Sequence, residues 1–93
     1  MISVISSVLS GTMYLIFDKE TIEEQELTEG MTIGLKILGI TRKNSYSERN
    51  IYFRRELKHY TNTSLKMSIP KKFAEALGLE DGDLVNMEIT KKE

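Results

Sequence analysis

The chain has no cysteine, no tryptophan, one histidine and one proline among its 93 residues. Without cysteine it forms neither disulfides nor thiolate metal sites, so packing and hydrogen bonds must hold the fold. The apolar stretch over residues 1–17 has no basic leader, is interrupted at Ser10 and Gly11, and is too short to span a membrane. We therefore expect a cytoplasmic protein without a membrane segment.

The composition is otherwise that of an ordinary globular domain. Apolar residues make up 40% of the chain and charged residues 29%, which is too apolar for intrinsic disorder. A chain of this length has room for one hydrophobic core. We expect a single domain over residues 1–93.

The clearest pattern lies in the second half. Alternating apolar residues from Leu65 to Ile69 predict a strand, and Pro70 ends it at the start of a short helix. Gly78 is a natural helix stop, because glycine adopts the left-handed cap conformation at little cost. A polar turn over residues 80–83 then precedes a second alternating run, Val85 to Ile89.

The first half repeats this pattern, shifted by the 52 positions that separate Leu15 from Met67. The shift needs no gap and places both outer strands in phase. It also matches identical residues at Lys19/Lys71, Glu23/Glu75, Leu27/Leu79, Gly30/Gly82 and Ile37/Ile89. Chance likeness of two amphipathic stretches is the alternative, but a turn glycine recurring in place favours an internal repeat.

One more strand is predicted at the start of each half, within residues 1–9 and 50–60, each followed by a short polar hairpin. The sequence thus predicts two strand-strand-helix-strand repeats, residues 1–41 and 50–93, joined by a linker at 42–49. Six strands with two short helices suffice for a pseudo-twofold, mainly β barrel without exposed edges. Because both halves lie in one chain, we expect a monomer.

Residues 66–89, KMSIPKKFAEALGLEDGDLVNMEI, resemble the AbrB/SpoVT-type domain, in which a strand ends in Ile-Pro, a helix in Leu-Gly-Leu, and a Gly-Asp turn enters the next strand. Many such domains are DNA-binding transcription factors or antitoxins. Two fused units resemble the cradle-loop barrels, so the resemblance implies a RIFT barrel, with a double-psi barrel as the alternative. It also implies a structural turn role for Gly30, Gly82 and Asp83, although the first half departs from the pattern at Asp18 and Met31.

Positive charge is concentrated in one region of a chain with net charge −1. Residues 42–72 contain nine basic and two acidic residues, whereas the segments on either side are both acidic. A basic stripe of this kind provides phosphate contacts. The expected nucleic-acid contacts are Arg42, Lys43, Arg49, Arg54, Arg55, Lys58, Lys66, Lys71 and Lys72.

The charge and the resemblance together predict a DNA-binding transcription regulator that contacts phosphates. An alternative is that the basic half forms salt bridges with the acidic half. A flavin- or nucleotide-binding protein like the RIFT-barrel riboflavin kinases and a protein-docking adaptor are further alternatives. The aromatic residues in the basic region could stack on bases, but Phe53 fits a core position better.

Catalytic signals are weak. His59 is the only histidine, and no serine has an evident base partner, so a nucleophilic triad is unsupported. The adjacent carboxylates Glu23, Glu24 and Glu26 are more typical of a solvated helix face than of a metal site. We expect no enzyme activity, no metal and no cofactor.

Overall fold

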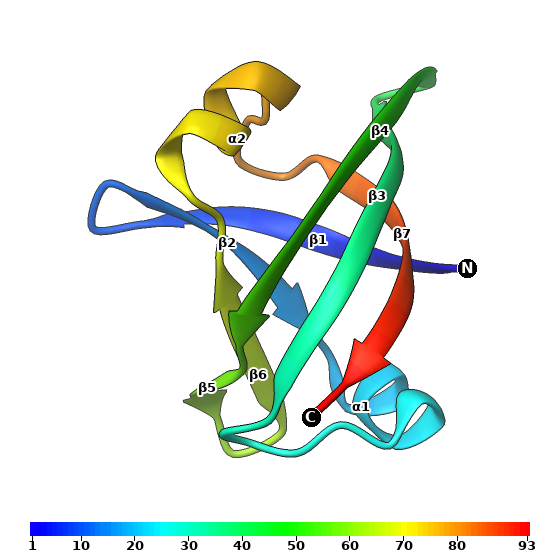
Figure 1. The fold of residues 1–93 in the computed structure, drawn as a ribbon. Helices are drawn as coiled ribbons and strands as arrows, with labels where there is room; N and C mark the ends of the chain where they lie inside the picture. The colour runs from blue at the N-terminus through cyan, green and yellow to red at the C-terminus, as the bar shows by residue number, and fades with distance from the viewer.

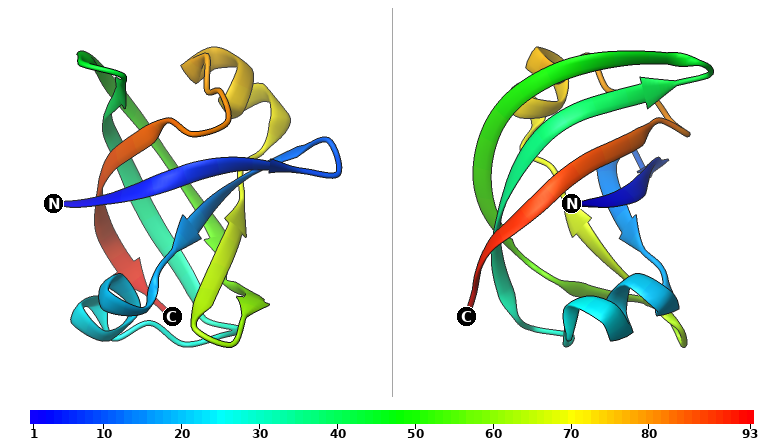
Figure 2. Two further views of the ribbon diagram at one scale, coloured as in Figure 1. Left: turned by 180° about the vertical axis from the view of Figure 1, so that it is seen from behind. Right: turned by 90° about the vertical axis from the view of Figure 1, so that its right-hand side faces the viewer.

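A computed structural model describes all 93 residues as one seven-stranded antiparallel sheet with two short helices (Figure 1). The elements follow in the order β1 (Ile2–Leu9), β2 (Thr12–Phe17), α1 (Lys19–Gln25), β3 (Thr32–Arg42), β4 (Ser45–Glu56), β5 (Lys58–Thr61), β6 (Ser64–Ser68), α2 (Lys71–Leu77) and β7 (Leu84–Lys92). Across the sheet the order is β4-β3-β7-β1-β2-β6-β5. The sheet curves strongly around the core, with α1 and α2 at opposite ends (Figure 2).

The sequence pattern predicted six strands, whereas the structure has seven. The predicted strand over residues 50–60 begins earlier, at Ser45, and is divided at Leu57 into β4 and β5. Residues 42–49 are therefore not an irregular linker but the tip of the β3–β4 hairpin, where Lys43 adopts a left-handed backbone with φ of 56°. The hairpin tip is made mostly of polar residues, so it lacks the alternating apolar residues by which a strand is recognised in a sequence.

Both predicted helices are present, and α2 has the expected ends. The side chain of Asp18 caps α1 by accepting a hydrogen bond from the Thr21 N–H at 2.9 Å. Pro70 precedes α2, and Gly78 ends it with φ of 66°. α1 instead ends at Glu26, a non-glycine residue with φ of 55°. Neither helix is long and apolar enough to cross a membrane.

The β2–β6 ladder follows the 52-residue shift. Leu15 lies directly opposite Met67, so the shift maps this pair onto itself. The shift converts each of the other pairs into another observed pair. It converts Tyr14–Ser68 into Lys66–Ile16, and Phe17–Leu65 into Ile69–Met13. The register of the β2–β6 ladder is therefore unchanged when the 52-residue shift exchanges the two strands.

The β3–β7 ladder shows the same relation. Lys36 lies opposite Glu88 and this pair maps onto itself. The ladder has two register shifts, one on either side of the Lys36–Glu88 pair, and the 52-residue shift converts each into the other. The exchanged pairs are Leu35–Ile89 with Ile37–Met87, Gly34–Lys91 with Gly39–Asn86, Ile33–Lys92 with Ile40–Val85, and Thr32–Glu93 with Thr41–Leu84.

The first strand of each half connects different parts of the sheet. β1 pairs first with β7 and then with β2, while the run through β4 and β5 pairs first with β3 and then with β6. Ser6 and Leu57 occupy equivalent places. The N–H of Gly82 donates to the Ser6 carbonyl and that of Gly30 to the Leu57 carbonyl, both at 2.8 Å.

The core lies inside the curved sheet. Sixteen apolar side chains are buried there. They come from α2, from every strand except β5, and from the connecting residues Leu27, Leu57 and Ile69. The edge strands β4 and β5 are not paired with each other. Instead, the Arg55 side chain of β4 donates to the hydroxyl of Ser68 on β6 at 2.9 Å, and Phe53 stacks on Phe73 of α2 with ring centroids 5.4 Å apart. Side chains thus fill the space that the main-chain ladder leaves open.

Candidate nucleic-acid interface

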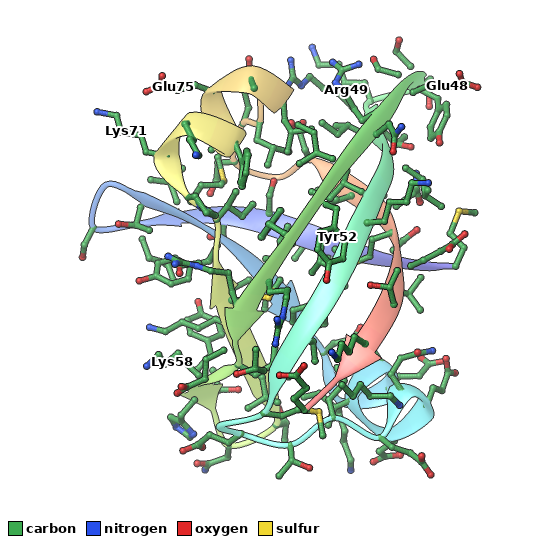
Figure 3. The ribbon with its side chains drawn as sticks, in the orientation of Figure 1. Glu48, Arg49, Tyr52, Lys58, Lys71 and Glu75 are labelled. Atoms are coloured by element: carbon green, nitrogen blue, oxygen red, sulfur yellow. The ribbon has the colours of Figure 1, made fainter.

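The nine basic residues expected to contact nucleic acid do not form one stripe. Six of them surround α2 or its neighbouring hairpins: Arg42, Lys43, Arg49, Arg55, Lys71 and Lys72. The other three lie on β4, β5 and β6. Figure 3 shows Lys71 and Arg49 at the α2 end of the molecule and Lys58 well away from it. Neighbours in sequence are therefore separated by the curvature of the sheet.

Arg42 is held by an internal carboxylate. Its Nε and Nη2 donate to the two carboxylate oxygens of Asp83 at 2.8 and 2.7 Å, and Nη2 also donates to the Gly78 carbonyl at 2.7 Å. Its Nη1 lies 3.2 Å from a carboxylate oxygen of Glu80. Nearly every donor of this guanidinium is occupied, so Arg42 joins β3 to the turn before β7 and is not a free phosphate ligand.

Asp83 is the buried half of this pair, with only 2% of its surface exposed. Its carboxylate also accepts the Glu80 backbone N–H at 2.8 Å. The hydrogen bonds from Arg42 hold the pKa of Asp83 below its ordinary value, although burial acts in the opposite direction. The Gly-Asp turn and a distant arginine thus form one unit, which sequence spacing could not reveal.

The turn glycines adopt the backbone that glycine favours. Gly30 has φ of 88° and Gly82 has φ of 91°. Met31 occupies the first-half position equivalent to Asp83, and its carbonyl accepts the Leu57 N–H at 2.8 Å. The two turns therefore share a main-chain arrangement, but only the second has the carboxylate and its arginine.

The three basic residues away from α2 all have partners. Arg54 forms an ion pair with Glu93, and the Lys58 ammonium lies 3.3 Å from a carboxylate oxygen of Glu56. The ammonium of Lys66 lies 4.9 Å from the centre of the Tyr14 ring. For Arg54 and Lys58 the salt-bridge alternative describes the structure better than a phosphate contact does.

A polar hollow of about 490 Å³ lies between the β3–β4 hairpin and the C-terminal end of α2. We call it the hairpin hollow. Its walls include Ile40, Arg42, Lys43, Ser45, Ser47 and Arg49, and no carboxylate lines it. Lys43 and Arg49 have no acidic partner within ion-pairing distance.

A larger groove of about 640 Å³ lies on the other side of α2, against the β1–β2 hairpin. We call it the α2 groove. Arg55, Ser68 and Lys71 provide polar groups, and Ala74 is part of its apolar wall. Glu75 and Glu80 also border it. A volume of this size lies within the usual range for small-ligand sites.

A quasi-equivalent groove of about 350 Å³ lies at α1. Its residues include Lys19, Ile22 and Glu23, which the 52-residue shift maps onto Lys71, Ala74 and Glu75 of the α2 groove. We call it the α1 groove. His59 and Glu29 also line it, with a nitrogen–oxygen distance of 3.4 Å. The smaller α1 groove thus provides an internal comparison for the α2 groove.

The aromatic residues of the basic region divide as expected between core and surface. Phe53 is buried, whereas Tyr46 and Tyr52 are 52% and 51% exposed. Both tyrosines reach diagonally over glycines of β3. A Cβ added at Gly39 would lie 2.1 Å from the Tyr46 hydroxyl oxygen, and one at Gly34 would lie 2.6 Å from that of Tyr52. The pairing of each tyrosine with a glycine across strands escaped the sequence pattern.

The structure defines a small, mainly β protein with one curved antiparallel sheet and two short helices. Comparison of the chain with known protein families, with curated proteins and with solved structures found no match.

Proposed function

We propose that the protein is a nucleic-acid-binding regulator that contacts phosphates through the surface around α2. One observation carries this proposal: five basic side chains there have no carboxylate within ion-pairing distance. We call these residues the α2 basic surface: Lys43, Arg49, Arg55, Lys71 and Lys72. Arg54 and Lys58, which have acidic partners, do not belong to it.

The chemistry of this surface fits phosphate contacts rather than base reading. Flexible lysines bind phosphates as point charges and release counterions, which makes binding depend on salt. Such contacts position a protein on nucleic acid but carry no direct sequence information. Glu75 and Glu80 lie beside the surface and would oppose tight binding. We therefore expect moderate affinity with a clear salt dependence.

We further propose that the curved sheet is a RIFT-like cradle-loop barrel formed by internal duplication and related to the AbrB-type regulators. The strand pairs that exchange under the 52-residue shift support a twofold arrangement. The equivalent hydrogen bonds at Ser6 and Leu57 support it as well. A monomer in solution follows from this proposal, because both halves of the barrel come from one chain.

Removal of three lysines from the α2 basic surface tests the function. The variant Lys43→Gln/Lys71→Gln/Lys72→Gln should bind a duplex DNA pool at least about tenfold more weakly at low salt. Each lost phosphate contact should also make the log–log salt slope shallower by about 0.9. Fluorescence anisotropy at several salt concentrations measures both quantities.

The matched control is Lys19→Gln/Lys58→Gln/Lys91→Gln, which removes the same charge from exposed lysines that lie near carboxylates. It should bind nearly as the unmodified protein does. An equal loss in both triple variants would show that only net charge matters. Absence of duplex binding by the unmodified protein at low salt would reject the function.

The α2 groove favours a second candidate function, binding of a flavin or nucleotide. Arg55 and Lys71 provide two cationic groups for a phosphate, beside an apolar wall that includes Ala74. At a hundredfold excess over its dissociation constant, a ligand stabilises the folded state by about 2.7 kcal/mol. In a domain of this size that raises Tm by roughly 10–20 °C.

Thermal shift measurements with riboflavin, FMN, ATP and CTP test this candidate. In the α1 groove an isoleucine, Ile22, occupies the position equivalent to Ala74. The variant Ala74→Ile should therefore narrow the α2 groove and abolish the shift, while Ile22→Ala should leave it unchanged. Equal shifts in the two variants, or none in the unmodified protein, would remove this candidate.

A further inference from the structure

The β3–β4 hairpin carries polar side chains on its inner face. Side chains alternate between the two faces of a strand, so Ser45, Ser47 and Arg49 share one face of β4 while Tyr46 and Glu48 share the other. Ser45, Ser47 and Arg49 line the hairpin hollow. Figure 3 shows Arg49 on the side that faces α2 and Glu48 pointing away from it.

The register fixes the distribution of charge in the hollow. Ser45 lies opposite Arg42 and Ser47 opposite Ile40. The guanidinium of Arg42 is held by Asp83, by Glu80 and by the Gly78 carbonyl, so Arg42 lines the hollow in a fixed position. Those two carboxylates are already paired with Arg42, and neither Lys43 nor Arg49 has a carboxylate within ion-pairing distance.

The donors available in the hollow suit an oxyanion. Arg49 donates one N–H to the Glu48 carbonyl at 2.8 Å, and its other guanidinium donors are free of protein partners. Lys43 adds an ammonium group, and the two serines add hydroxyl groups. Guanidinium, ammonium and hydroxyl donors together match a tetrahedral phosphate, which offers several acceptor oxygens.

We propose that the hairpin hollow is a phosphate-binding site in which Lys43, Arg49, Ser45 and Ser47 hold a single phosphate group. The phosphate belongs either to a nucleic-acid backbone or to a free phosphorylated compound. The first source rests on the proposed function, whereas the second is independent of it. Arg42 positions this site by joining β3 to the turn before β7, without binding the phosphate itself.

Pyrophosphate is the probe for the test. Titration of the isotope-labelled protein, followed by amide chemical shifts, should perturb residues of the hairpin hollow with a saturable response. The double variant Lys43→Gln/Arg49→Gln should weaken this binding at least about tenfold, because it removes two charge-assisted contacts. The matched control Arg54→Gln/Lys58→Gln removes the same charge from two residues that have acidic partners outside the α2 basic surface, and it should bind as the unmodified protein does.

One further double variant distinguishes binding in the hollow from a merely electrostatic effect. Ser45→Ala/Ser47→Ala keeps the charge and removes the hydroxyl donors, so it should weaken pyrophosphate binding severalfold if the hollow holds the anion. No change in this variant, or equal losses in the two charge variants, would overturn the inference. Absence of any saturable response in the unmodified protein would overturn it as a site for free phosphate compounds.

The same variants in duplex binding separate the two sources. If duplex DNA binds and Lys43→Gln/Arg49→Gln weakens it more than Arg54→Gln/Lys58→Gln does, the phosphate is that of a nucleic acid. If both variants bind duplex equally, the inference fails for nucleic acid while the proposed function stands. If pyrophosphate binds in the hollow and duplex does not bind at all, the proposed function fails and the site serves a free phosphate compound.

Discussion

Replacing Leu15 by alanine should lower the free energy of unfolding by about 3 kcal/mol. Leu15 is fully buried and lies opposite Met67 at the centre of the β2–β6 ladder. Truncation of a buried leucine removes apolar contacts and leaves a cavity, and such changes cost about 2–5 kcal/mol. Urea unfolding followed by circular dichroism measures the loss, which corresponds to a decrease in Tm of more than about 10 °C.

The control for this change is Ile5→Ala on the outer face of β1, where the side chain is exposed. It should cost less than about 1 kcal/mol, as surface substitutions usually do. Met67→Ala should cost about as much as Leu15→Ala, because both residues are fully buried at equivalent positions. A cost near zero at Leu15 would contradict the central placement of this pair.

Replacing Asp83 by asparagine should have the second largest effect, about 2–4 kcal/mol at neutral pH. The change keeps the size of the side chain but removes the charge that Arg42 and the Glu80 N–H bind. Asp83 is buried whereas Arg42 is partly exposed, and loss of the buried carboxylate leaves two donors of Arg42 without their charged acceptor. Urea unfolding at pH 7 measures the cost.

The pH dependence gives an independent test of the same contact. Arg42 lowers the pKa of Asp83 from its ordinary value of 3.8, so the ionised carboxylate is bound more tightly in the folded state. The resulting stability is fully present above about pH 4. It is lost as the pH decreases through the lower pKa of the folded state.

Unfolding at pH values from 7 down to 2 should therefore show a smaller difference between the unmodified protein and Asp83→Asn at the acidic end. Asp18→Asn is a useful comparison, because the pKa of Asp18 is also lowered, by its hydrogen bonds with Thr21, but its carboxylate is exposed. Its effect should be smaller at every pH. A difference for Asp83→Asn that stays constant down to pH 2 would show that the carboxylate contributes no ionic stabilisation.

Most of the secondary structure could be predicted because its signals are local. Alternation marks β6 and β7, and a cap or a stop residue marks each helix. The β4–β5 region was predicted less well. Residues 45–50 are mostly polar on both faces of the strand, so no apolar face identified it. The break at Leu57 depends on main-chain hydrogen bonds with Gly30 and Met31, which are distant in sequence.

The candidate site was only partly predictable, because charge in sequence is not charge in space. The count of basic residues drew attention to the second half of the chain. The contacts that occupy Arg42 and Arg54 join residues about forty positions apart, and no local pattern encodes them. The hairpin hollow was missed for the same reason that β4 was shortened: its serines lie in a stretch that seemed to be a linker.

Leu57 gives the sheet a mechanical property. This one residue joins β4 to β5, the two outermost strands of the sheet order, and its own N–H is held by the Met31 carbonyl. An ordinary open sheet can fray from each edge separately. Here the two edges are consecutive stretches of one chain, so an opening that begins at either edge places tension on the other. The amide hydrogens of β4 and β5 should therefore exchange in one shared opening event.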